Sequence, residues 1–329
     1  MRTSLWALGC ALWALWLPSA VDAQTVAQRV ARAPDGAVFI EVASRLGTCG
    51  DGREIIGFRN ALFGRNFQTI GNWTNVRCVP GPVRVTLTVA AGVVTQMRAQ
   101  IGGSWASSET RVTDVGSVAP EEASAFFFTL VPALEARGGS RKDRILLPAV
   151  LADAPALQPL IAIARNDDRA RHTRQQALQW LGLLGDDSVL PTLMELARNR
   201  DDGLSGAALM ALSILDDEAG NRAARWLLER VADSREPLDL RKNALFWAGQ
   251  REATPTAELV RAYRDAQTRE LREHAIFVLS QRKDGAATDE LIRMAREEKD
   301  TEMRGKALFW LAQKDDPRVR KLIADLILK

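Results

Sequence analysis

The chain has 329 residues, 47% of them hydrophobic and 26% charged, which excludes an intrinsically disordered chain and a multi-span membrane protein. With 44 basic and 41 acidic side chains the formal net charge is only +3, so the strong positive charge of a nucleic-acid-binding protein is missing. Two histidines and three cysteines make a clustered-histidine metal site or a zinc ribbon nearly impossible, and we expect no metal and no other cofactor.

The first 23 residues have the pattern of a secretory signal peptide. Arg2 precedes an uncharged apolar run from Leu5 to Leu17, which is too short to cross a bilayer as a helix. Small and aliphatic residues before the expected cleavage site place the cut after Ala23. The alternative is a retained membrane anchor, which the short run and Pro18 disfavour. We expect an exported mature chain, periplasmic or extracellular, without an integral membrane span.

The cysteines support the same compartment. Cleavage after Ala23 removes Cys10 and leaves an even number, Cys49 and Cys78. In an oxidising compartment such a pair is expected to form a disulfide. The alternative is a reactive thiol pair, but a Cys-x-x-Cys motif is absent and the spacing is long, so a structural disulfide is favoured.

The pattern of residues 24 to 118 predicts a small β-rich domain that this disulfide crosslinks. Val83–Val89 alternates apolar with polar residues, a turn follows at residues 90–92, and residues 93–101 resume an extended pattern. These features predict a β-hairpin. Residues 36–42 predict a further strand.

From residue 119 to the C-terminus the pattern is helical, and it becomes clearly repetitive from about residue 140. Five blocks with the pattern Ala-Leu/Ile-x-x-x begin at alanines spaced by 31, 36, 31 and 32 residues: Ala177, Ala208, Ala244, Ala275 and Ala307. A second helix in each unit is marked by Leu193, Leu227, Leu259, Leu291 and Leu322. Helix pairs this short must stack to bury their apolar faces, so the region predicts a right-handed α-solenoid and a mainly α fold overall.

Three further features of the repeats have both a structural and a functional interpretation. Tryptophans recur three residues after a block alanine, at Trp180, Trp247 and Trp310, and we interpret them as packing residues rather than a ligand platform. Asp-Asp pairs at the repeat turns are interpreted as helix caps rather than calcium ligands. The two histidines, His172 and His274, are interpreted as residues of helix surfaces or caps, and no catalytic residue is identified.

Three segments carry a resemblance to a known family. Residues 240–247, 271–278 and 303–310 resemble HEAT repeats of the phycobilin-lyase-like type, over about 190 residues to the C-terminus. The resemblance implies an α-solenoid and, for this repeat class, mainly a protein-binding scaffold. Iron-dependent hydroxylases of this architecture carry His-Glu pairs, and this sequence has none. The β-rich domain resembles no family that we recognise.

Arginines near the ends of the second helices are the candidate binding residues. Arg165, Arg198, Arg264 and Arg296, here called the arginine ladder, are spaced by repeat lengths, and Arg230 lies near the same phase. In HEAT-like stacks the second helices line the concave side, so the ladder suits the carboxylates of an acidic partner. The alternative is compensation of helix dipoles.

The function expected from these features is that of an exported, non-catalytic scaffold for a protein partner, with no nucleic acid bound. The alternative is an enzyme or enzyme-maturation factor, either similar to bilin lyases or with its site in the N-terminal domain. The oligomeric state is left open.

Overall fold

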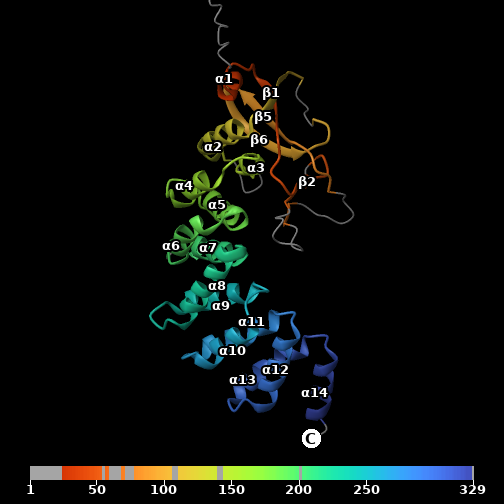
Figure 1. Ribbon diagram of the computed structural model, residues 1–329, viewed down its shortest axis with the longest axis vertical. Helices are drawn as coiled ribbons and strands as arrows, with labels where there is room; N and C mark the ends of the chain where they lie inside the picture. The colour runs from red at the N-terminus through yellow and green to blue at the C-terminus, as the bar shows by residue number, and fades with distance from the viewer. Residues whose placement is uncertain are drawn as a thin grey trace, which may run out of the picture.

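A computed structural model describes residues 24–53, 56–58, 68–70, 78–105, 110–138, 144–199 and 202–327. The predicted signal peptide, residues 1–23, lies outside the described residues. A β-rich unit forms one end of the molecule, and helices follow one another along the long axis toward the C-terminus (Figure 1). The predicted fold class, a helical repeat array preceded by a small β-rich unit, is confirmed.

The larger sheet of the β-rich unit has the strand order β6-β5-β1-β7. Its strands are β1 (Gly36–Val42), β5 (Val83–Ala90), β6 (Val93–Ile101) and β7 (Val112–Val118). The predicted hairpin is β5–β6, and its turn places Ala91 and Gly92 at φ 52° and 72°, a region that glycine favours. β1 is antiparallel to β5 and parallel to β7.

One face of this sheet is buried under helices. Alternate residues of β5, Val83, Val85 and Leu87, are 0% exposed, as the alternating sequence pattern predicts. Three helices contact the sheet: α1 (Val26–Ala31) lies against β7, α2 (Pro120–Ala136) against β6, and α3 (Leu147–Leu151) against β5 and β6. The sheet therefore has a helical cover.

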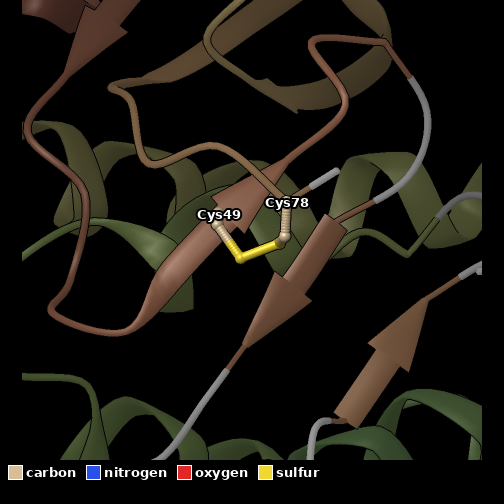
Figure 2. Close-up of a disulfide and its surroundings, with 2 residues drawn as sticks. All are labelled: Cys49 and Cys78. Carbon is tan, nitrogen blue, oxygen red and sulfur yellow. A yellow bond between two sulfur atoms is a disulfide. The ribbon is translucent and has the colours of Figure 1, made fainter. Parts of the chain in front are cut away.

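A second, three-stranded sheet is tied to the first by the disulfide (Figure 2). Its strands are β2 (Thr48–Gly50), β3 (Ile56–Phe58) and β4 (Gln68–Ile70). Cys49 of β2 is bonded to Cys78, which confirms the predicted disulfide. Beside it, the backbones of Gly50 and Val79 exchange hydrogen bonds of 3.0 and 2.9 Å. The disulfide thus joins β2 to the segment that leads into β5.

Arg45 connects the β-rich unit to the helices. Its guanidinium donates hydrogen bonds to the carbonyl oxygens of Val150, at 3.1 Å, and Ala152, at 3.2 Å, and also to that of Ala154. Ser44 and Ala152 form a β-bridge, and the backbone N–H of Arg45 donates to Leu151 at 2.7 Å. Burial lowers the pKa of Arg45. The two parts are therefore in direct contact, and the predicted boundary between residues 118 and 119 stays a prediction.

The helices beyond α3 form the predicted pairs. The first helices of the pairs are α5 (Arg171–Leu184), α7 (Asp202–Ile214), α9 (Leu238–Gln250), α11 (Arg269–Gln281) and α13 (Thr301–Ala312). The second helices are α4 (Leu157–Arg165), α6 (Leu190–Ala197), α8 (Asp217–Ala232), α10 (Thr256–Asp265), α12 (Gly285–Glu297) and α14 (Pro317–Ile327), with a short 3-10 turn, η1 (Asp187–Val189), before α6. Each first helix contacts the next one along the stack, and all five block alanines are 0% exposed.

Small residues allow these first helices to approach closely. At Gly182 of α5, a Cβ atom would lie 2.8 Å from both the Cα and the carbonyl oxygen of Ala211 in α7. No side chain fits between the two backbones at that distance. Bulky residues fill the wider spaces: Trp180 is 8% exposed, and the ring of Trp310 lies 5.1 Å from that of Phe277 in the preceding repeat. These contacts agree with the packing interpretation of the tryptophans.

Buried arginines cap the C-terminal ends of the second helices α4 and α8. Arg174 donates to the carbonyl oxygen of Ala164 at 3.0 Å, and Arg241 donates to that of Val231 at 2.9 Å. Both arginines stand three residues before a block alanine and are buried, at 8% and 4% exposure. The last carbonyls of a helix have no partner within the helix, so these guanidiniums satisfy them and oppose the negative end of the dipole.

A second set of cations caps the C-terminal ends of the first helices α7, α9 and α11 in the same way. Arg251 donates to Ser213 at 3.0 Å, Arg282 donates to Gly249 at 3.1 Å, and Lys314 donates to the carbonyl oxygen of Arg282 at 2.9 Å. Each of these cations therefore caps the first helix of the preceding repeat. These five cations, Arg174, Arg241, Arg251, Arg282 and Lys314, thus connect neighbouring helices of the stack.

Candidate binding site

The arginine ladder occupies equivalent places in four second helices. Arg165 is the last residue of α4, Arg198 is the C-cap of α6, and Arg264 and Arg296 lie in the last turns of α10 and α12. The side chains of Arg165, Arg198 and Arg264 are 47%, 50% and 62% exposed. The structure thus places the four arginines at equivalent C-terminal ends of second helices. At this position a guanidinium can bind a ligand or interact with the negative end of the helix dipole.

Three of the ladder arginines pair with glutamates of the following repeat. Arg165 lies 2.5 Å from Glu195 of α6, and Arg264 lies 3.8 Å from Glu290 of α12. Arg198 lies 3.2 Å from Glu236, in the loop after α8. Three of the four ladder arginines therefore form ion pairs between repeats, and the sequence did not reveal these partners. Glu236 and Glu290 are only 16% and 15% exposed, whereas the exposed pair of Arg165 with Glu195 contributes only about 0–1 kcal/mol.

Arg230 has a different role from the ladder arginines. Its guanidinium lies 3.0 Å from Glu236 and stacks on the ring of Trp226, 5.4 Å from the ring centre. Arg198 approaches the same carboxylate and the same ring, at 5.7 Å. Only 14% of the Arg230 side chain is exposed. This cluster fixes the loop between α8 and α9.

A groove of about 750 Å³ lies between α8 and α10, on the side of the second helices. Leu228 and Ala232 of α8, Ala262 of α10 and Ala266, the C-cap of α10, give it an apolar lining. The groove lies beside the longest repeat, in which 36 residues separate the block alanines Ala208 and Ala244. Its second helix, α8, has 16 residues, whereas α10 has 10. We call it the α8–α10 groove.

Charged side chains surround this apolar lining. Arg225 and Glu229 stand on the α8 side, and Glu258, Arg261 and Asp265 stand on the α10 side. Arg261 pairs with Glu258 at 3.1 Å and remains 67% exposed. Arg264 of the ladder follows Arg261 by three residues, so one helical turn separates it from the groove edge. The groove and the ladder therefore adjoin on α10.

Sequence reasoning identified the ladder but not the groove. The repeat spacing located the ladder arginines because each stands at the same place in its repeat. The groove depends on the separation of α8 and α10, for which the only signal was the longer second interval between block alanines, the 36 residues from Ala208 to Ala244. Within the described part of the chain, no group of three or more histidine, cysteine, aspartate or glutamate side chains is placed to hold a metal ion.

Comparison with known proteins supports the class of repeat. Residues 157–247, which run from α4 into α9, match the family model described as HEAT repeats. The helix pairs over this range are HEAT-like repeats, as the sequence resemblance indicated. A search of curated proteins finds no match.

One solved structure that matches is that of the complex of CpcE and CpcF of phycocyanin lyase from Nostoc sp. PCC7120. The match covers 64% of this chain and 80% of that chain, at 18% identity and a TM-score of 0.29. A similarity of this degree does not transfer a function. Separately, none of the helices in the described residues combines the length and apolar character that a membrane crossing requires.

Proposed function

We propose that this chain is an exported, non-catalytic HEAT-like scaffold that binds a protein partner along the side of its second helices. The observation that carries the proposal is the α8–α10 groove, an apolar channel with charged edges that adjoins the arginine ladder. Repeat stacks offer extended surfaces of this kind, on which a partner segment contacts several repeats at once.

The ladder arginines beside the groove support an acidic partner segment, whereas the groove lining itself carries three arginines and three carboxylates. The side chains of Arg165, Arg198 and Arg264 stay 47%, 50% and 62% exposed beside their glutamate partners, so carboxylates of a partner can share these contacts. Guanidiniums bind carboxylates through paired hydrogen bonds, which gives orientation as well as attraction. The apolar lining of the groove would receive side chains of the same segment.

Export is the second part of the proposal. The disulfide between Cys49 and Cys78 is stable in an oxidising compartment, and the signal-like pattern of residues 1–23 supplies a route to one. In this proposal cleavage after Ala23 leaves a periplasmic or extracellular chain. Residues 24–118 form its β-rich domain and residues 119–329 its solenoid.

Neutralising the ladder tests the function. We expect the triple variant Arg198→Gln, Arg264→Gln and Arg296→Gln to capture its partner from envelope extracts of the natural host at least tenfold less well than the unmodified chain. Three charge-assisted contacts of about 1 kcal/mol each would account for that loss. Glutamine is used because glutamate would repel Glu236 and Glu290 and disturb the fold. Capture is measured by quantitative mass spectrometry at several salt concentrations.

A matched variant removes the same charge elsewhere. Arg98, Arg235 and Arg320 are exposed and lie outside the ladder, so their change to glutamine should leave capture unaltered. Partner binding that falls equally in both variants, or in neither, would contradict the proposed role of the ladder. If the arginines serve only the helix dipoles, the triple ladder variant would melt earlier and bind normally.

A further inference from the structure

The short helix α1 lies at the end of the molecule opposite the C-terminus, and its first turn is held on both sides (Figure 1). Thr25 is its N-cap: the hydroxyl of Thr25 accepts from the backbone N–H of Gln28 at 3.3 Å, and the side chain of Gln28 accepts from the backbone N–H of Thr25 at 3.0 Å. Val26 is 1% exposed, and its N–H donates to the carboxylate of Glu122 in α2. The fold therefore holds the chain from Thr25 onward.

Gln24 lies just outside this arrangement. It is exposed, it precedes the N-cap, and its side chain makes no hydrogen bond to another of the described residues. Other glutamines are engaged: Gln28 completes the capping box, and the amide nitrogen of Gln100 donates to three carbonyl oxygens. The carboxamide of Gln24 is therefore free to react with a nucleophile that reaches it.

Removal of residues 1–23 would create such a nucleophile on the same residue, because Gln24 would then carry the free α-amino group of the chain. An α-amino group has a pKa of about 8, so part of it is neutral near pH 7 and its nitrogen has a lone pair. In glutamine this nitrogen can reach the side-chain carbonyl carbon, Cδ, and close an unstrained five-membered ring. In asparagine the corresponding ring would have four members and would be strained.

We propose, on the basis of the cleavage in the proposed function, that Gln24 is a modification site and is present in the mature chain as pyroglutamate. The α-nitrogen attacks Cδ, and a bond forms between these two atoms. The bond from Cδ to Nε2 breaks, and ammonia leaves with one proton from the α-nitrogen. The product is a neutral lactam, and its formation requires no oxidant, reductant or cofactor.

The lactam protects the N-cap of α1 from trimming. Proteolysis concentrates at chain ends, and aminopeptidases require a free α-amine, which the lactam lacks. The next residue, Thr25, makes both hydrogen bonds of the capping box. Behind it, Val26 and Val30 of α1 are buried in the core, at 1% and 5% exposure. Pyroglutamate at position 24 therefore protects the first residue that the fold holds.

The test is the mass of the N-terminal peptide of the mature chain, isolated from the envelope of the natural host. Free amines of the intact, denatured chain are first dimethylated, which prevents later cyclisation, and residues 24–29 are then released after Arg29 by trypsin. We expect most of this peptide to be undimethylated at its α-nitrogen and lighter than its glutamine form by about 17 Da, the mass of ammonia. The peptide that begins at Gln175, which trypsin releases after Arg174, reports any cyclisation that occurs during digestion.

Gln24→Asn is the matched variant, because it keeps a primary amide but does not form the lactam. Its first residue should be dimethylated, and an aminopeptidase should remove residue 24 from this variant but not from the chain that carries Gln24. A dimethylated Gln24 in most chains, or equal removal of residue 24 from both chains, would overturn the modification and leave the cleavage standing. A mature chain that begins at another residue would overturn the cleavage and the modification together.

Discussion

Gly182→Ala is expected to destabilise the folded chain by about 2–4 kcal/mol, although alanine is the better helix former. The added Cβ atom would lie 2.8 Å from the backbone of Ala211 and 2.7 Å from Ile214, both on α7. Backbone atoms cannot move aside without separating α5 from α7 and loosening the stack. The change is measured as the shift of the urea midpoint in circular dichroism, at constant slope.

Gly206→Ala is the control for this prediction. It introduces the same methyl group into α7, but at a position where a Cβ atom meets nothing within 4 Å. The gain in helix propensity should then stabilise the chain by about 0.5–1 kcal/mol. A shift of the urea midpoint in the same direction in both variants would contradict this explanation. It would mean that the close approach of α5 and α7 is not the reason for glycine at position 182.

Removing the disulfide is expected to destabilise the β-rich unit by about 3–4 kcal/mol, the value of the chain-entropy relation for a loop of this length. Cys49 and Cys78 are 29 residues apart, and the sheet that contains β2 consists of three-residue strands only. In the double variant Cys49→Ser and Cys78→Ser, hydrogen exchange should accelerate in residues 36–101. Exchange in the helices from α5 to α13 should change little, because their core lies in the stack.

Thiol labelling provides the complementary measurement. In the folded, unreduced mature chain, Cys49 and Cys78 should not react with a maleimide, and both should react after reduction and unfolding. Labelling of either residue before reduction would contradict the disulfide. Faster exchange throughout α5 to α13 in the double serine variant would instead show that the two parts of the chain unfold together.

The repeat architecture could be predicted because its physical demands recur in the sequence. Each unit needs a small residue where first helices meet, so alanine returns every 31 to 36 residues, and all five alanines are buried. The hairpin was visible for a similar reason, since one face of β5 must be apolar. Both patterns reflect burial that recurs at a regular interval, every second residue in the strand and every 31 to 36 residues in the stack, so a single sequence displays them.

The roles of individual arginines could not be predicted in the same way. Arg241 is 4% exposed and caps a helix end, whereas the side chain of Arg264 is 62% exposed, yet both appear in the sequence as arginines at repeat spacing. The two arginines differ in their position within the repeat. Arg241 stands three residues before the block alanine of a first helix, whereas Arg264 stands near the end of a second helix. The partners Glu195 and Glu236 depend on contacts between repeats, which spacing alone does not reveal.

Photo-crosslinking from the α8–α10 groove tests most directly whether a protein partner occupies this surface. A benzophenone amino acid replaces Ala232, which is exposed and lines the groove, or Ala257, which is exposed on α10 outside the groove lining. Irradiation of the natural host should yield one dominant crosslinked protein from position 232, and its yield should fall in the ladder variant. Position 257 should yield little of it. Identical products from both positions, or none from position 232, would contradict the proposed binding site.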